Sequence, residues 1–142
     1  VVLRVKCGLG VGAMLVLIGG GCASGGKLGA KALSQQSKSL ESEAAEGSLL
    51  AQDAASGGST RIYTREHSSE LAGAASHAED TLKAAKIEPP LESKARELAV
   101  LAGQISVDLQ RLRNASRDEA RALARELQAA ARASQKIGEG LK

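Results

Sequence analysis

The sequence predicts an all-α protein, either an antiparallel helical bundle or a set of helical hairpins with coiled-coil-like seams of Ala and Leu. Composition is the first reason, because the 142 residues include 26 Ala and 19 Leu but only one aromatic residue, Tyr63. Ala and Leu lose little side-chain freedom in a helix, whereas strands favour β-branched and aromatic residues. The other reasons are that apolar residues recur at alternating steps of three and four, and that helix breakers separate these runs.

A first helix is predicted over residues 33–55. Its apolar and small residues keep heptad-like spacing, although Gly47 interrupts the seam and Ser37 fills the preceding position. The seam residues are Leu40, Ala44, Gly47, Ala51 and Ala54. Gly57-Gly58 then ends the helix, since glycine favours turn conformations over the middle of a helix.

A second helix is predicted from about Thr60 to Lys86. Ser59 or Thr60 can cap its start, because a side-chain oxygen there accepts a hydrogen bond from the first turn. One face carries the seam Leu71, Ala75, Ala78, Leu82 and Ala85. Pro89-Pro90 stops this helix, since proline has no N–H and pushes the preceding residue out of the helical conformation.

The strongest periodicity begins at Leu91. The first seam is Leu91, Ala95, Leu98, Ala102, Ile105, Leu109 and Leu112. A second seam, out of register with the first, is Ala120, Leu123, Leu127, Ala130, Ser134, Ile137 and Leu141. A turn at residues 114–116 accounts for the change of register, and Ser116 with Glu119 forms a capping box for the next helix. A single helix over residues 91–137 is the alternative, because no proline interrupts this stretch.

The first 21 residues are organised like the signal peptide of an exported protein. Arg4 and Lys6 form a short positive segment, and the apolar run at residues 7–18 follows. This run of about a dozen residues is shorter than the roughly 20 that a membrane-spanning helix needs. We expect three parts: a signal peptide at 1–21, a flexible Gly-rich tether at 22–32 and a helical domain at 33–142.

Gly19-Gly20-Gly21-Cys22 resembles the lipobox of bacterial lipoproteins. The resemblance implies that Cys22 carries diacylglycerol and an acyl chain such as palmitate, and becomes the first residue after cleavage. Such an anchor would hold the protein at the bacterial cell envelope. In a cell with two membranes, Ala23 in place of Asp implies the outer membrane, facing the periplasm. An ordinary signal peptide with an incidental Cys22, or an uncleaved N-terminal membrane helix, is the alternative.

Two His-x-x-acid pairs occur on the second predicted helix. They are His67 with Glu70 and His77 with Asp80. Spacing of three residues brings the members of each pair together on the helix surface, so they are weak candidates for a metal site. Di-iron bundles instead use Glu-x-x-His pairs, which this chain lacks. We favour a solvated polar face, and the sequence predicts neither a metal nor another cofactor.

Cations are frequent in the C-terminal third. They are Arg111, Arg113, Arg117, Arg121, Arg125, Arg132 and Lys136. Such a stripe suits anionic phospholipid, lipopolysaccharide or peptidoglycan. The alternative is a solubilising face in which interleaved acids form ion pairs. Nucleic acid is not an expected partner, because no aromatic stacking residues accompany the arginines.

The C-terminal residue gives a second, more general resemblance. Braun-type lipoproteins join an acylated Cys to a heptad-repeat helix whose terminal Lys is linked to peptidoglycan. Cys22, the seam over 91–112 and Lys142 are similar in plan, which implies peptidoglycan as a partner. The chain departs from that family at Pro89-Pro90, where the family has one continuous helix.

No enzyme is expected, because the sequence contains no nucleophile-elbow, P-loop or zinc-protease motif. The expected function is therefore that of a membrane-anchored envelope lipoprotein, acting as a structural or protein-interaction module and able to self-associate. The alternative is a small binding module for a metal or for an anionic envelope component.

Overall fold

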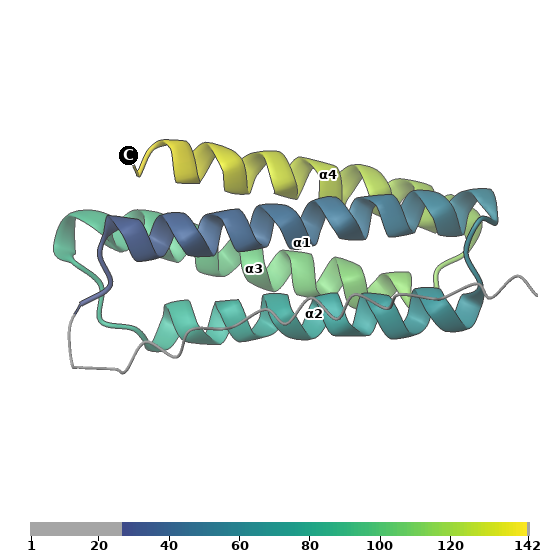
Figure 1. Ribbon diagram of the computed structural model, residues 1–142, viewed down its shortest axis with the longest axis horizontal. Coiled ribbons are helices and arrows are strands. Elements are labelled where there is room, and N and C mark those ends of the chain that lie inside the picture. Colours follow the sequence, from purple (N-terminus) through teal and green to yellow (C-terminus); the bar gives the residue numbers. More distant parts are fainter. Residues whose placement is uncertain (1–26, 142) are drawn as a thin grey trace, which may run out of the picture.

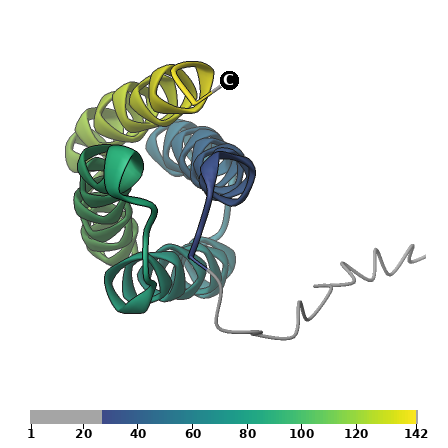
Figure 2. The same ribbon diagram turned by 90° about the vertical axis from the view of Figure 1, so that its left-hand side faces the viewer.

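The protein is an antiparallel four-helix bundle, as the sequence predicts. The computed structural model describes residues 27–141. In these residues the chain forms α1 (Ala30–Ser56), α2 (Arg61–Ala84), the short 3-10 helix η1 (Pro89–Leu91), α3 (Glu92–Leu112) and α4 (Arg117–Glu139). The four α-helices run alternately up and down (Figure 1) and occupy the corners of a square when seen from the end (Figure 2).

Two pairs of helices make most of the contacts. α1 packs most extensively on α4, and α2 on α3, whereas α1 with α2 and α3 with α4 form smaller interfaces. Only α1 and α3 touch across the diagonal to any extent. The first and last helices of the described chain therefore lie side by side, and this pairing closes the bundle.

The predicted seams form the core. On α3, the six seam residues after Leu91 are buried, while Leu91 itself is half-buried. The buried members of the second seam are Ala120, Leu123, Leu127, Ala130 and Ser134 on α4 and Leu141 just after it. The seam of α2 is buried from Leu71 to Leu82, and that of α1 from Leu40 to Ala51, with Ala54 half-buried. Heptad spacing therefore identified the inner face of each helix.

The structure confirms the predicted hairpin and rules out a single helix over residues 91–137. α3 ends at Leu112, and α4 begins at Arg117 after Ser116, whose hydroxyl accepts a hydrogen bond of 3.3 Å from the Glu119 N–H. Thr60 caps α2 in the same way, through the Tyr63 N–H at 3.2 Å. Gly57 ends α1 in the left-handed conformation, with φ of 81°, which a residue with a Cβ rarely adopts.

The prediction of a flexible tether over residues 22–32 was wrong for its last part. α1 begins at Ala30, three residues before the expected start of the helical domain. Before it, the Leu28 N–H donates to the Lys86 carbonyl at 2.7 Å, and the Glu88 N–H donates to the Leu28 carbonyl at 3.2 Å. This pairing holds the segment in place through main-chain bonds that composition does not reveal. It also explains why α2 ends at Ala84 and not at Lys86, since residues 86–88 are paired in extended form.

Small residues let the backbones of the main pairs approach closely. Two α1 serines donate to α4 carbonyls, Ser37 to Ser134 at 2.6 Å and Ser48 to Ala124 at 2.8 Å. A Cβ placed on Gly47 would lie 3.3 Å from Leu127 Cδ1 on α4 and only 2.6 Å from Leu109 Cδ2 on α3, so a side chain there would have to displace two fully buried leucines. The glycine that interrupts the predicted seam of α1 is thus part of the packing.

We predict that Gly47→Leu lowers the free energy of unfolding by about 1–3 kcal/mol or more, because the added side chain overpacks a filled core. Gly73→Ala is the matched control, since a Cβ there meets no atom within 4 Å. It should raise stability by about 0.5–1 kcal/mol through helix propensity. Chemical denaturation followed by circular dichroism measures both. Equal effects at the two positions would contradict the role given to Gly47.

Candidate functional site

Cys22, the predicted lipid-attachment residue, lies outside the described residues, and so does Lys142. The described chain starts at the exposed residue Lys27, at the end of the bundle where α1 and α3 begin (Figure 1). We call this the entry end. The far end carries the turn between α1 and α2 and the turn between α3 and α4.

Lysines and arginines are distributed unequally between the two ends. All lysines among residues 27–141 lie in the half of the bundle nearer the entry end: Lys27, Lys31, Lys38, Lys83, Lys86, Lys94 and Lys136. Most arginines of the described chain lie in the other half. Acids occur in both halves, so the two ends differ in the type of cation more than in net charge.

His67 is held between two carboxylates. Its Nε2 lies 2.7 Å from Glu46 Oε1 on α1, and its Nδ1 lies 3.5 Å from Glu70 Oε2. Tyr63 stacks on the imidazole, with ring centroids 5.5 Å apart. The predicted pair of His67 and Glu70 therefore does meet, but it works with Glu46 as a contact between α1 and α2.

The two predicted His-x-x-acid pairs do not combine into one site. His77 lies ten residues beyond His67, which is about 15 Å along a helix. Residues 27–141 contain no cluster of three or more His, Cys, Asp or Glu arranged to hold a metal ion. His67 lies in the contact between α1 and α2, and His77 and Asp80 are exposed on α2.

Glu43 is a titratable group that the sequence did not indicate. It lies one turn before Glu46 on α1, and its Oε2 is buried without a hydrogen-bond partner in the described chain. Burial raises the pKa of this carboxyl to about 7, and the nearby charge of Glu46 adds to the effect. A buried carboxyl without a partner favours its neutral form.

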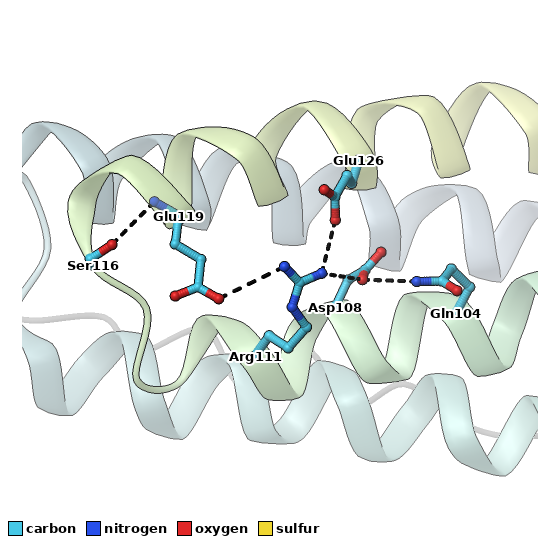
Figure 3. A network of polar contacts seen from close by, with 6 residues as sticks. All are labelled: Gln104, Asp108, Arg111, Ser116, Glu119 and Glu126. Atoms are coloured by element: carbon cyan, nitrogen blue, oxygen red, sulfur yellow. Dashed lines mark hydrogen bonds and ion pairs between the residues drawn. The ribbon is translucent and has the colours of Figure 1, made fainter.

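Arg111 belongs to an ion-pair network that joins α3 to α4. Figure 3 shows its guanidinium among three acids, with Glu126 at 3.1 Å, Asp108 at 3.3 Å and Glu119 at 3.8 Å. Asp108 is only 2% exposed, and Gln104 also donates to it at 2.9 Å. Burial raises the pKa of Asp108, against the opposing effect of these donors. This part of the predicted basic stripe is therefore structural.

Other cations of the stripe line a groove between α1 and α4. The groove has a volume of about 560 Å³ and is lined by Arg121, Arg125 and Arg132 of α4 and by Gln52 of α1, without a carboxylate. Alanines form much of its remaining lining. Arg125 and Arg132 make no ion pair with any residue of the described chain, whereas Arg121 pairs with Asp118. We call this the arginine groove. The remaining members of the stripe, Arg113, Arg117 and Lys136, are exposed.

The outer face of α3 exposes two valines that the periodicity did not single out. Val100 is 73% exposed and Val107 51% exposed. Val100 shares a shallow groove with Leu101 on α3 and with Ile137 on α4. Val100 and Val107 are seven residues apart and lie on the face of α3 opposite the buried seam. This spacing was the signal in the sequence that could have indicated an exposed apolar strip.

The described residues therefore form an up-and-down four-helix bundle with an arginine-lined groove between α1 and α4 and an apolar strip on the outer face of α3. Comparison of the chain with protein-family models, with curated proteins and with solved structures gives no match.

None of the helices in residues 27–141 has the length and apolarity needed to cross a bilayer.

We predict that Glu43→Gln removes a pH dependence of stability. A carboxyl whose pKa rises from 4.5 to about 7 on folding stabilises the protein fully below pH 4.5, and this contribution is lost as the pH rises to about 7. Above pH 7 the variant should therefore be more stable than the wild type, by about 1 kcal/mol because Glu43 is partly solvated. Thermal unfolding across this pH range measures the difference. Parallel stability curves for the two proteins would contradict the assignment.

Proposed function

We propose that the protein is a bacterial envelope lipoprotein that Cys22 anchors to the membrane, and that its helical bundle serves as a non-enzymatic structural or protein-interaction module. In a cell with two membranes, we place it on the outer membrane, facing the periplasm. The observation that carries the proposal is the lipobox-like Gly19-Gly20-Gly21-Cys22 after a short apolar run.

The position of the bundle relative to Cys22 supports this proposal. Only seven residues separate Cys22 from Ala30, where α1 begins, so the anchor would hold the entry end close to the membrane. The lysines nearest this end include the exposed Lys27 and Lys31. Exposed lysines near an anionic membrane surface add roughly 1 kcal/mol each to attachment.

The outer strip of α3 supports the interaction role. Exposed apolar residues are common singly, but here Val100 lies beside the half-buried Leu101 and Ile137 in one groove. Charged and polar residues, among them Arg96 and Glu97, line the same groove, and an apolar strip with a polar rim is typical of protein contacts. Both an envelope protein and a second copy of the chain are partners compatible with such a strip.

The arginine groove favours a second candidate function, binding of an anionic envelope component such as phospholipid, lipopolysaccharide or peptidoglycan. Three guanidiniums line this groove and no carboxylate does. Arginine is well suited to phosphate and carboxylate groups, because its planar fork of N–H donors matches their oxygens.

We predict that a clickable palmitate analogue labels the wild-type protein in cells and that Cys22→Ala abolishes the label. Cys7→Ala is the matched control, since it removes the only other thiol of the chain. It should keep the label and the membrane fraction, because Cys7 belongs to the predicted signal peptide. Gel fluorescence and membrane fractionation provide the readouts. Unlabelled wild-type protein, or label retained in Cys22→Ala, would refute the anchoring proposal.

A further inference from the structure

The far end of the bundle contains a pocket rich in arginine. Its volume is about 590 Å³, and it lies between the turn that joins α1 to α2 and the turn that joins α3 to α4. Three guanidinium side chains line it, Arg61 from the start of α2, Arg113 after α3 and Arg117 at the start of α4. Polar groups of Ser59, Asn114 and Ser116 also line the pocket, and no carboxylate does. We call it the far-end pocket.

None of the three arginines has an ion-pair partner among residues 27–141. The nearby acids are engaged elsewhere, since Asp118 pairs with Arg121 and Glu119 with Arg111. Asp53, in the last turn of α1, does not line the pocket. The Arg117 guanidinium lies over the α1–α2 turn, where a Cβ on Gly57 would come within 3.3 Å of Nη2. Three like charges thus share one pocket without an internal counter-charge.

Guanidinium charges, and not helix dipoles, set the potential of the far-end pocket. α2 and α4 begin at this end, and their N-termini carry partial positive charge. α1 and α3 end here as well, so their C-termini cancel that contribution to first order. The Thr60 and Ser116 caps further satisfy one N–H in each N-terminal turn. The three full charges therefore remain as the main attraction for an anion.

We propose that the far-end pocket binds the phosphate group of a small phosphorylated ligand. Arginine forks pair with the oxygens of a phosphate through two parallel hydrogen bonds, and a group with two negative charges offsets the repulsion of three guanidiniums better than a carboxylate does. The volume exceeds that of a phosphate alone and falls in the range of small-ligand sites. Among the described residues the Asn114 amide that lines the pocket has no hydrogen-bond partner, whereas the Ser59 hydroxyl bonds to Thr64 and the Ser116 hydroxyl accepts from the Glu119 N–H.

This proposal goes beyond the candidate function given to the arginine groove, because it assigns a separate anion site and a chemical class, and it does not depend on Cys22. Two sources carry the same chemistry, a dissolved phosphate compound and a phosphomonoester lipid head group. α1 has 27 residues, so the pocket lies about 40 Å from the entry end.

The test is a calorimetric titration of the full chain with pyrophosphate at low salt. We expect one binding site per chain. Arg61→Gln and Arg117→Gln should each weaken binding about tenfold or more, because each removes a charge-assisted contact. Arg65→Gln is the matched control, since Arg65 lies one turn after Arg61 on α2 but lines neither the far-end pocket nor the arginine groove, and its affinity should stay within about twofold of the wild type. No binding at millimolar pyrophosphate, or equal loss in all three variants, would overturn the proposal.

Thermal unfolding separates loss of the site from loss of the fold. Without phosphate, Arg61→Gln and Arg117→Gln should unfold at or above the wild-type temperature, because each relieves repulsion among like charges. Pyrophosphate should raise the unfolding temperature of the wild type and of Arg65→Gln but not of the double variant Arg61→Gln/Arg117→Gln. A double variant that pyrophosphate still stabilises would refute the site.

Vesicles distinguish the two sources of phosphate. Phosphatidylcholine vesicles with and without phosphatidic acid are sedimented with the wild type and the double variant. If the wild type binds vesicles that contain phosphatidic acid and the double variant does not, the ligand is a lipid head group. If the wild type binds pyrophosphate but not these vesicles, the ligand is a dissolved phosphate compound. Binding lost in Arg125→Gln but kept in Arg61→Gln would move the anion site to the arginine groove and refute this proposal. Palmitate labelling at Cys22 is unaffected by any of these results.

Discussion

Close backbone approach between α1 and α4, and between α2 and α3, is the constraint on which the rest of the bundle depends. A core of Ala and Leu buries little area per residue, so the helices must come close together for dispersion contacts to add up. On α1, Gly47 leaves the space that Leu127 of α4 and Leu109 of the diagonally placed α3 fill. Serines reach carbonyls of the opposite helix across both close pairs, Ser48 from α1 to α4 and Ser106 from α3 to α2. Buried hydroxyls are thereby satisfied without a larger gap.

At the two smaller interfaces, α1 with α2 and α3 with α4, longer charged side chains join the helices. Glu46 of α1 meets His67 of α2, and Arg111 of α3 meets Glu126 of α4. Neither contact needs the backbones to be close, because a charged side chain spans the distance. Each such contact is partly exposed and adds little stability by itself. They nevertheless orient one close pair relative to the other. Glu43 is half-buried near Glu46, and its Oε2 has no hydrogen-bond partner in the described chain.

The sequence was sufficient for the inner faces of the helices but not for their partners. Steps of three and four residues identify the buried side of α3 because only one face of a helix can meet a core. The same pattern does not state that α1 packs on α4, since every Ala/Leu seam resembles the others. Ser116 caps α4 as predicted. The Glu119 carboxylate, which was expected to complete the capping box, instead forms an ion pair with Arg111 of the preceding helix, α3. Likewise the stripe of cations omitted Arg61, because only the antiparallel topology brings it beside Arg113 and Arg117.

The same topology explains why the arginines of the far end remain without acids. Asp118 and Glu119 occupy the first turn of α4, where acids are favoured, and i to i+3 spacing or the hairpin geometry directs them to Arg121 and Arg111. Arg61 and Arg117 are the first residues of α2 and α4, and no acid stands three or four residues after either of them, whereas Arg113 lies in the turn after α3. Repulsion among them costs stability that the helical framework must offset, and an anion from solution would remove that cost. An isolated surface cation needs no such explanation, but three around one pocket of about 590 Å³ do.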